Sequence, residues 1–306
     1  MTPAITVRAP AKINLHLGVG APREDGFHPL DTVYQAVRIY DDVAAQEAET
    51  WALRVGTADH IAADAVPTGE RNIVYRAARL LSDFHGVPLR GNLRISKDIP
   101  VAGGMAGGSA DAAAALVALD RLWGVDTADD DLLRIAAALG SDVPFALLGG
   151  SAHGTGRGEI VQQVTDAGTW WWVVVPSREG LSTPSVYNRF DALVPDAPAV
   201  PPSAEAVLAA LSSGDPAHLA GALRNDLQAP AIDLRPGLGD LVARGEREGA
   251  LRGLVSGSGP TVVFLCDSAD SARAVAASLG APDSVVWVAT AAVAGAHVVR
   301  QPVRSH

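Results

Sequence analysis

Four glycines, Gly103, Gly104, Gly107 and Gly108, lie close together directly before an alanine-rich segment with helical character. Glycine costs backbone entropy, so such a cluster indicates a place where the backbone must approach something closely. The N–H groups that begin the following helix are free and carry the positive end of its dipole. The segment 100–110 therefore predicts a loop that cradles phosphate groups. A tight turn that allows close helix packing is the alternative.

Lys12 and Lys97 are the two lysines of a chain that otherwise uses arginine. A compact ammonium is not replaced by a planar guanidinium, so we interpret both lysines as marking sites. Lys12 lies in an otherwise apolar strand pattern, and Lys97 stands just before the glycine-rich segment. For Lys97 in particular, a surface lysine at the end of a strand is the alternative.

Other nucleotide-binding and metal-binding patterns do not fit. No Lys-Ser or Lys-Thr follows the glycines, so the segment is not a P-loop. The glycine spacing and the order of the elements around it are a poor match to a dinucleotide-binding fingerprint. The histidines show no zinc-ligand spacing, and we predict no metal bound directly by side chains.

Composition narrows the class of protein. The chain has 306 residues, of which 48% are hydrophobic and 19% charged, with a net charge of −10. These values indicate a globular protein and argue against nucleic-acid or membrane-surface binding. Cys266 is the single cysteine, which excludes an internal disulfide. The first residues do not resemble a signal peptide, so we expect a cytoplasmic protein.

The elements that must position these residues follow a mixed order of strands and helices, without a βαβ rhythm, which favours an α+β fold. We expect Ser109 to cap the helix after the glycines, Asn72 to cap an earlier helix, and the tryptophans 170–172 to lie in a core strand. We also expect a strand, a turn and a second strand over 5–19, and a strand–turn–strand unit over 251–266. Single strands are expected over 33–41, 91–100 and 284–291, and an exposed loop over 194–203. Helices are expected over 72–86, 109–124, 126–140, 204–214, 238–250 and 268–280.

Three segments in order carry a resemblance to a known family. PVAGGMAGGSA (100–110) resembles the phosphate-binding motif of the galactokinase, homoserine kinase, mevalonate kinase and phosphomevalonate kinase (GHMP) superfamily. APAKINLHLGV (9–19) and SGSGPTVVFL (256–265) resemble its N-terminal and C-terminal motifs. Met105 stands where the motif usually has leucine and Phe27 where tyrosine is frequent; both keep bulk and apolarity.

The resemblance is most specific to one branch of that superfamily, through DGFHPLDTVYQAV, GSDVPF and LSTPSVY. It implies ATP-dependent phosphorylation of the 2-hydroxyl of 4-diphosphocytidyl-2-C-methyl-D-erythritol, with Mg²⁺ on the nucleotide. It also implies two lobes: an ATP-binding domain over 1–162, like domain 2 of ribosomal protein S5, and a ferredoxin-like substrate-binding domain over 163–306. The last strand is expected to be able to return to the first domain.

The same resemblance implies roles for individual residues. Lys12 and Asp142 match the catalytic pair, and helix capping is the alternative for Asp142. ATP would be bound by Asn72, Lys97, Pro100, Val101, Ala102, Gly103, Gly104, Met105, Ala106, Gly107, Gly108, Ser109 and Ala110. The substrate would be bound by Asn14, Phe27, His28, Thr183 and Tyr187, with Phe27 and Tyr187 stacking on cytosine and His28 reading its edge; ordinary packing is the alternative for these three.

Rival functions stay open at this point. Another superfamily kinase, such as homoserine kinase, lacks a use for a cytosine pocket, and a sensor without catalysis would have no need of Lys12 and Asp142. For partners we expect a small cytidyl diphosphate substrate, no nucleic acid and no membrane. We expect a monomer or a weak homodimer.

Overall fold

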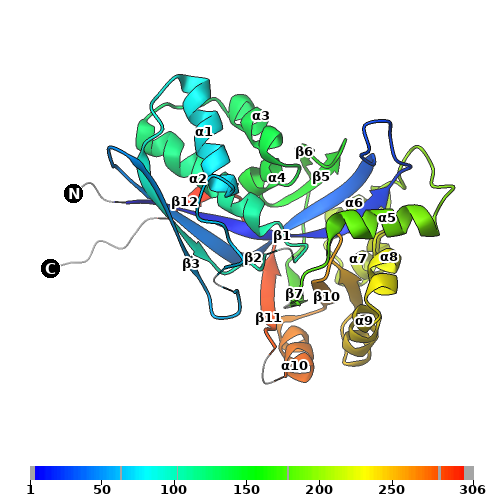
Figure 1. Cartoon of the computed structure of the whole chain (residues 1–306). Coiled ribbons are helices and arrows are strands. Elements are labelled where there is room, and N and C mark those ends of the chain that lie inside the picture. The colour runs from blue at the N-terminus through cyan, green and yellow to red at the C-terminus, as the bar shows by residue number, and fades with distance from the viewer. Residues whose placement is uncertain (1–3, 63, 102, 178, 282–283, 300–306) are drawn as a thin grey trace.

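One mixed β-sheet runs through the whole molecule and carries helices along its length (Figure 1). The computed structural model describes residues 4–62, 64–101, 103–177, 179–281 and 284–299. Among these residues the main strand order is β12-β1-β2-β11-β7-β10-β9, with β4 and β5 also pairing with β2 and β8 with β1. The expectation of an α+β fold is confirmed.

The strands are β1 (Ile5–Val19), β2 (Leu30–Gln46), β3 (Trp51–Thr57), β4 (Gly91–Lys97), β5 (Ser151–Thr155), β6 (Ile160–Gln163), β7 (Trp170–Val175), β8 (Arg224–Asn225), β9 (Arg252–Val255), β10 (Val262–Cys266), β11 (Trp287–Ala291) and β12 (His297–Val298). The helices are α1 (Ile73–His85), α2 (Gly107–Trp123), α3 (Asp129–Leu139), α4 (Val143–Leu148), α5 (Thr183–Leu193), α6 (Glu205–Ser213), α7 (Pro216–Ala222), α8 (Gln228–Leu234), α9 (Gly237–Arg247) and α10 (Ala269–Leu279).

The first strand corrects one expectation. In place of two strands joined by a turn, β1 is a single 15-residue strand paired along β2. Its register with β2 shifts between Pro10 and Ala11 and again between Asn14 and His16. Such irregularities bend and twist a strand without ending it, so the strand continues past Pro10 within the sheet. One strand therefore carries Lys12 and Asn14 and also reaches β8 in the second half of the chain.

The helix after the glycines also begins earlier than expected. α2 starts at Gly107 with Ala106 as its N-cap, and no side chain makes a capping hydrogen bond there. Ser109 therefore lies inside the first turn, and its prediction as the N-cap was wrong. Ala106 adopts the left-handed conformation (φ 56°) and turns the chain into the helix, so the N-cap lies three residues before Ser109. The small side chains of α2 pack closely on β1 and β2, which places its N-terminus beside Lys12.

β11, from the second half of the chain, lies between β2 and β7. It therefore joins the strands β12, β1 and β2 to the strands β7, β10 and β9 in one sheet. Trp170 and Trp172 of β7 are buried, as expected for a core strand. Their indole N–H groups donate to Asp166 Oδ1 (2.6 Å) and Gln35 Oε1 (2.9 Å). Both rings thus pack in the core with their polar atoms satisfied, and the bond from Trp172 to Gln35 joins the two halves of the chain.

The proline-rich segment 194–203 is an exposed loop, as expected, but it is attached to β1. His16 Nε2 lies 3.0 Å from the carbonyl oxygen of Pro202, and the N–H of Ala21 donates to Pro198 O at 2.8 Å. Burial lowers the pKa of His16 below its ordinary value. A neutral imidazole that donates through Nε2 suits this position.

Candidate active site

A cavity of about 920 Å³ lies where the glycine loop, the first half of the sheet and α5 meet. Its walls come from segments far apart in the sequence, which the fold brings to one place. The residues that line it are Lys12, Asn14, Leu17, Pro22, Gly26, Phe27, His28, Leu30, Tyr34, Ile73, Pro100, Gly103, Gly104, Ala106, Gly107, Gly108, Ser109, Ser141, Asp142, Arg157, Thr183, Pro184, Tyr187, Asn188, Asp191, Leu227, Gly257 and Ser258.

The glycine loop is supported from behind by the second glycine motif. The N–H of Thr261 donates to Gly103 O (3.2 Å), and Ser256 Oγ donates to Gly104 O (3.0 Å). Gly104 has φ +79°, and a Cβ at this position would collide with the backbone oxygen of Ser256. Only glycine permits this conformation and this approach together. The two motifs that stood apart in the sequence therefore form one structure.

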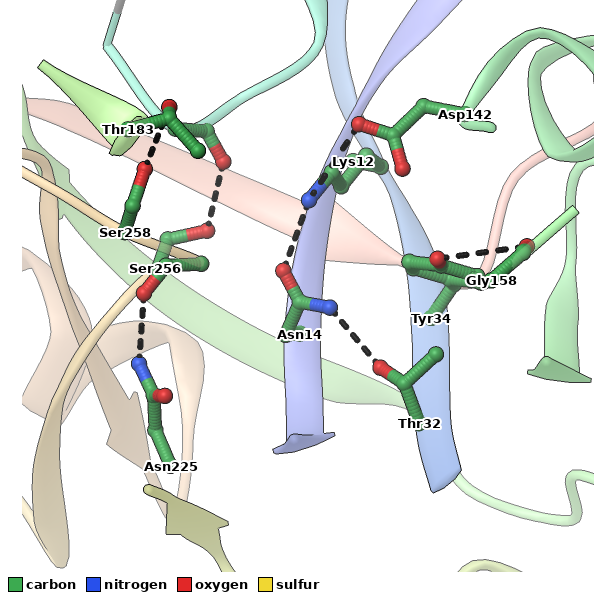
Figure 2. A network of polar contacts seen from close by, with 12 residues as sticks. Lys12, Asn14, Thr32, Tyr34, Asp142, Gly158, Thr183, Asn225, Ser256 and Ser258 are labelled. Atoms are coloured by element: carbon green, nitrogen blue, oxygen red, sulfur yellow. Dashed lines mark hydrogen bonds and ion pairs between the residues drawn. The ribbon is translucent and has the colours of Figure 1, made fainter. Parts of the chain in front are cut away.

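Lys12 and Asp142 both line the cavity, and their side chains point toward each other (Figure 2). Lys12 Nζ lies 3.7 Å from Asp142 Oδ2 and donates to Asn14 Oδ1 at 2.7 Å. Lys12 is buried, whereas the Asp142 side chain is 30% exposed to the cavity side. Asp142 holds the N-cap position of α4, but its side chain makes no capping hydrogen bond. Its carboxylate is therefore left for the lysine and for a bound molecule.

A short chain of hydrogen bonds orients Asn14. Its Nδ2 donates to Thr32 Oγ1 (2.9 Å), and that hydroxyl donates to the carbonyl of His16 (2.7 Å). The side chains of Asn14, Thr32 and His16 are all buried. Asn14, predicted to contact substrate, lines the cavity, and it also holds the ammonium of Lys12 in place. Buried networks of this kind restrict side-chain motion because each partner is satisfied in one arrangement.

Three aromatic rings predicted to recognise a base line the other end of the cavity. His28 lies against Tyr187, with ring centroids 4.9 Å apart. Phe27 is 51% exposed, and the guanidinium of Arg157 stands 4.8 Å from its ring centroid. Nε2 of His28 lies 2.8 Å from Asp191 Oδ1, which fixes the orientation of the imidazole. An exposed phenyl ring beside a polar edge is an arrangement suited to a planar ligand.

Arg157 and Asp191 were missed by sequence reasoning, as was Tyr34. Arg157 stands between two glycines with positive φ, Gly156 and Gly158, and nothing in that pattern separates it from other arginines. Asp191 follows Tyr187 by one helical turn on α5, so the pair could have been found by its helical spacing. The Tyr34 ring lies 5.4 Å from Lys12 Nζ. Burial and the nearby Asp142 raise the pKa of Tyr34 well above its ordinary value, which keeps the phenol neutral.

Lys97, predicted to bind ATP, is buried beneath the loop. Its ammonium donates to Asp41 Oδ2 and lies 3.1 Å from Asp111 Oδ2. Asp41 also accepts from the N–H groups of Asp98 (2.7 Å) and Ile99 (2.9 Å), which lead into the loop. Burial holds the pKa of Asp111 well above its ordinary value, and the Asp41 carboxylate adds to this effect, while Lys97 opposes it. The three side chains thus join β2, β4 and α2 directly behind the loop.

The remaining predicted nucleotide residues differ in position. Asn72 is buried and caps α1: it accepts from Val74 N (2.8 Å) and donates to Pro67 O (2.6 Å). Met105 and Ala110 are buried in the core, and Val101 is exposed. Pro100, Gly103, Gly104, Ala106, Gly107, Gly108 and Ser109 line the cavity. Ala102 lies outside the described residues. Thr183 lines the cavity and shares a hydrogen bond with Ser258 Oγ at 2.8 Å (Figure 2).

The chain is similar to known proteins along most of its length. Residues 72–150 match the family model for the GHMP kinases N terminal domain, and residues 205–283 match that for GHMP kinases C terminal. A protein of Nocardioides sp. named 4-diphosphocytidyl-2-C-methyl-D-erythritol kinase is 68% identical over 294 residues, covering 96% of this chain and 99% of that protein. One of the same name from Mycobacterium tuberculosis is 48% identical, covering 98% of this chain and 95% of that protein.

Solved structures give the same picture. A crystal structure of 4-(cytidine 5'-diphospho)-2C-methyl-D-erythritol kinase superposes with a TM-score of 0.75 at 33% identity, covering 93% of this chain and 98% of that one. Homoserine kinase from Cytophaga hutchinsonii superposes with a TM-score of 0.74 at 20% identity, covering 98% of each chain. The second likeness is one of fold.

Proposed function

The chain belongs to the GHMP kinases, and among them to the 4-diphosphocytidyl-2-C-methyl-D-erythritol kinases, and we propose that the cavity described above is where that reaction takes place. The enzyme uses ATP to phosphorylate the 2-hydroxyl of 4-diphosphocytidyl-2-C-methyl-D-erythritol, giving the 2-phosphate and ADP, in the non-mevalonate route to isoprenoid precursors. One observation carries the assignment of the site: the Lys12–Asp142 pair lies in one cavity with the glycine loop and the aromatic group.

The glycine loop is proposed to hold the triphosphate of ATP. Gly107 and Gly108 open α2, so their N–H groups are among those that the helix leaves unpaired. These groups and the helix dipole favour a phosphate at this end. The loop is held in position from behind by Lys97 and Asp111, which are buried. Asn72 then acts on the nucleotide indirectly, as the cap of the neighbouring helix α1.

Magnesium is proposed to enter on the nucleotide. In the described part of the chain, no group of three or more His, Cys, Asp or Glu side chains could hold a metal ion. Ser109 and Asp142 both line the cavity, and their oxygens are of the kind that Mg²⁺ prefers. Ser109, in the first turn of α2, would approach the ion, which would neutralise charge on the phosphates, while Asp142 stays available to the attacking hydroxyl.

Asp142 and Lys12 are proposed to act on the attacking hydroxyl. As the 2-hydroxyl oxygen forms its bond to the γ-phosphorus, the bond from that phosphorus to the β,γ-bridging oxygen breaks, and ADP leaves with the electron pair. Asp142 orients the hydroxyl by accepting its hydrogen bond and takes up the proton as the new bond forms. The ammonium at 3.7 Å offsets the negative charge that develops during transfer.

The aromatic end is proposed to bind cytosine. Phe27 and Tyr187 would stack on the two faces of the base, and His28, held by Asp191, would read its edge. The cation Arg157 stands beside Phe27, where it can pair with the diphosphate of the substrate. Asn14 and Thr183 line the cavity between this end and the catalytic pair, in the region of the methylerythritol diphosphate.

The organisation of the chain is also a proposal. We propose an ATP-binding domain over 1–162 and a substrate-binding domain over 163–306, with β11 returning to pair with β2 of the first domain. The substrate site lies between them, because the first domain contributes Asn14, Phe27 and His28 and the second contributes Thr183 and Tyr187. No helix in the described ranges is long and apolar enough to cross a membrane. Cys266, the single cysteine, is buried. We propose that the protein works in the cytoplasm as a monomer or weak homodimer.

The test is release of ADP by the purified protein with Mg–ATP, comparing 4-diphosphocytidyl-2-C-methyl-D-erythritol, homoserine, mevalonate and galactose. We expect turnover with the cytidyl substrate alone, and loss of it in D142N. Turnover with homoserine instead would discard the cytosine pocket and keep the fold. ATP binding without turnover on any acceptor would favour a sensor.

A further inference from the structure

A second hollow, of about 550 Å³, lies on the sheet face away from α1 and α2. Along β4, Leu93 and Ile95 are buried in the core, whereas Arg94 and Ser96 alternate with them and face outward. Figure 1 shows α1 to α4 gathered on one side of the strands that carry this hollow. It is lined by Arg8, Arg38, Ile39, Tyr40, Asp42, Gly56, Thr57, Ala58, Arg94, Ser96, Lys97, Asp98 and Trp287, none of which lines the active-site cavity.

The charged side chains that line the hollow are three arginines, Lys97, which is paired with the buried Asp41, and the carboxylates of Asp42 and Asp98, and Asp98 Oδ1 lies 3.8 Å from His60 Nε2. Arg8 is paired with Asp42 through two hydrogen bonds of 2.8 Å. No carboxylate of the described residues forms an ion pair with Arg38 or Arg94, and both residues are exposed. The whole chain has a net charge of −10, so two unpaired cations on one hollow do not follow from its composition.

The register of the sheet places a third cation beside these. β3 and β4 pair in parallel, and Arg54 is the partner of Arg94, with Gly56 opposite Ser96. Both arginines are exposed, and like charges in register on one sheet face repel each other. On its other side Arg94 faces Ala44 of β2, which offers no charge. A bound anion would relieve this repulsion.

Aromatic side chains form another wall of the hollow. Trp287 of β11 is partly exposed, and His60 packs edge-on against it at 5.2 Å between ring centroids. Tyr40 is held by the guanidinium of Arg8, 5.2 Å from its ring centroid. At Gly56 an added Cβ would meet nothing closer than 3.8 Å, so the missing side chain leaves room.

We propose that this hollow binds a small organic phosphate, with the phosphate held by Arg38 and Arg94 and a planar or apolar group against Trp287. The guanidinium fork matches phosphate oxygens in pairs, which a single ammonium does not. The indole provides an apolar surface for the remainder of the molecule. The site stands apart from catalysis, and it holds whether or not the proposed roles in the active-site cavity are correct.

The test is equilibrium binding of 1-naphthyl phosphate to the full-length protein by isothermal titration calorimetry. The same titration is made on R38Q/R94Q, whose substitutions lie outside the lining of the active-site cavity, so that binding lost in this variant belongs to the hollow. We expect one molecule bound per chain, with affinity that falls as salt is added. We expect the affinity to fall by at least about tenfold in R38Q/R94Q, because two charge-assisted contacts are lost.

Two further variants make the result specific. G56D places a carboxylate in the open space of the hollow and should abolish binding without disturbing the fold. R76Q removes an exposed arginine from α1, outside the residues that line the hollow, and should bind as the wild type does. Equal affinity in wild type and R38Q/R94Q overturns the proposal, as does binding of 1-naphthol as tight as that of its phosphate. Failure of the wild type to bind 1-naphthyl phosphate overturns it as well.

Discussion

The ammonium of Lys12 lies 3.7 Å from the carboxylate of Asp142, although one residue comes from the middle of β1 and the other from the N-terminus of α4. Lys12 is buried and is held by Asn14, while Asp142 opens to the cavity. Lys12 is therefore the residue held in a fixed position, and Asp142 is the residue that a substrate hydroxyl can reach. This difference in exposure leads to the first prediction.

Replacing Asp142 with asparagine should lower kcat by about 10²–10⁴-fold, because the amide cannot take up a proton. KM for ATP should change little, since the N-cap position of α4 makes no use of the carboxylate. Steady-state ADP release measures both constants. D129N, in the exposed first turn of α3, is the matched control and should behave as the wild type. An unchanged kcat in D142N would remove this residue from catalysis.

Removing either proposed stacking ring should weaken binding of the cytidyl substrate. Stacking is worth about 1–3 kcal/mol per base, so F27L or Y187L should raise KM for that substrate by roughly 5–150-fold. KM for ATP should stay the same in both variants. F84L, which changes an exposed phenylalanine of α1, is the control. A rise in both KM values would indicate a packing role.

Lys97, which forms a buried ion pair, should contribute more to the free energy of unfolding than an arginine in an exposed ion pair does. K97M leaves Asp41 and Asp111 buried together without a cation, which should cost about 3–5 kcal/mol of unfolding free energy. Urea denaturation measures the loss. R79M breaks the exposed Arg79–Asp83 pair and should change stability by less than about 1 kcal/mol. Equal losses in the two variants would contradict a buried ionic group.

Gly104 should not tolerate a side chain. Its φ of +79° and the approach of Ser256 O both oppose a Cβ, so G104A should destabilise the protein by about 1–3 kcal/mol and raise KM for ATP. The two effects are read from thermal unfolding and from initial rates. At Gly69 an added Cβ would meet nothing within 4 Å, and G69A should be neutral. A neutral G104A would show that the loop can adopt another path.

His16 should make stability depend on pH. Burial lowers its pKa below 6.5, so its contribution is complete above the unfolded value and is lost as the pH falls through the lower folded value. Between about pH 7.5 and about pH 5, the wild type should therefore lose more unfolding free energy than H16Q, which cannot titrate. Urea denaturation at the two pH values gives the comparison. H218Q, at an exposed histidine, should lose as much as the wild type.

Much of the local structure could be predicted from the sequence, because it depends on neighbouring residues. Asn72 caps α1 and Gly86 ends it in the left-handed conformation, as their types indicated. The alternation of β4 and the burial of Trp170 and Trp172 followed from apolar periodicity. The prediction failed at Ser109. Serine is a good N-cap residue, but Ala106 turns the chain into the helix before Ser109, so Ser109 does not cap it.

What the sequence determined by itself was the chemistry available, namely a glycine loop, two lysines and an aspartate at the start of a helix. Only the tertiary structure decided which of these residues face the cavity and which are buried against other charges. Lys12 faces a cavity, whereas Lys97 is neutralised under the loop by Asp41 and Asp111. The pairing of Arg157 with Phe27 and of Arg54 with Arg94 likewise depends on contacts between distant segments. Periodicity and turn chemistry act over a few residues, but the surroundings of a charge are set by every segment that packs around it.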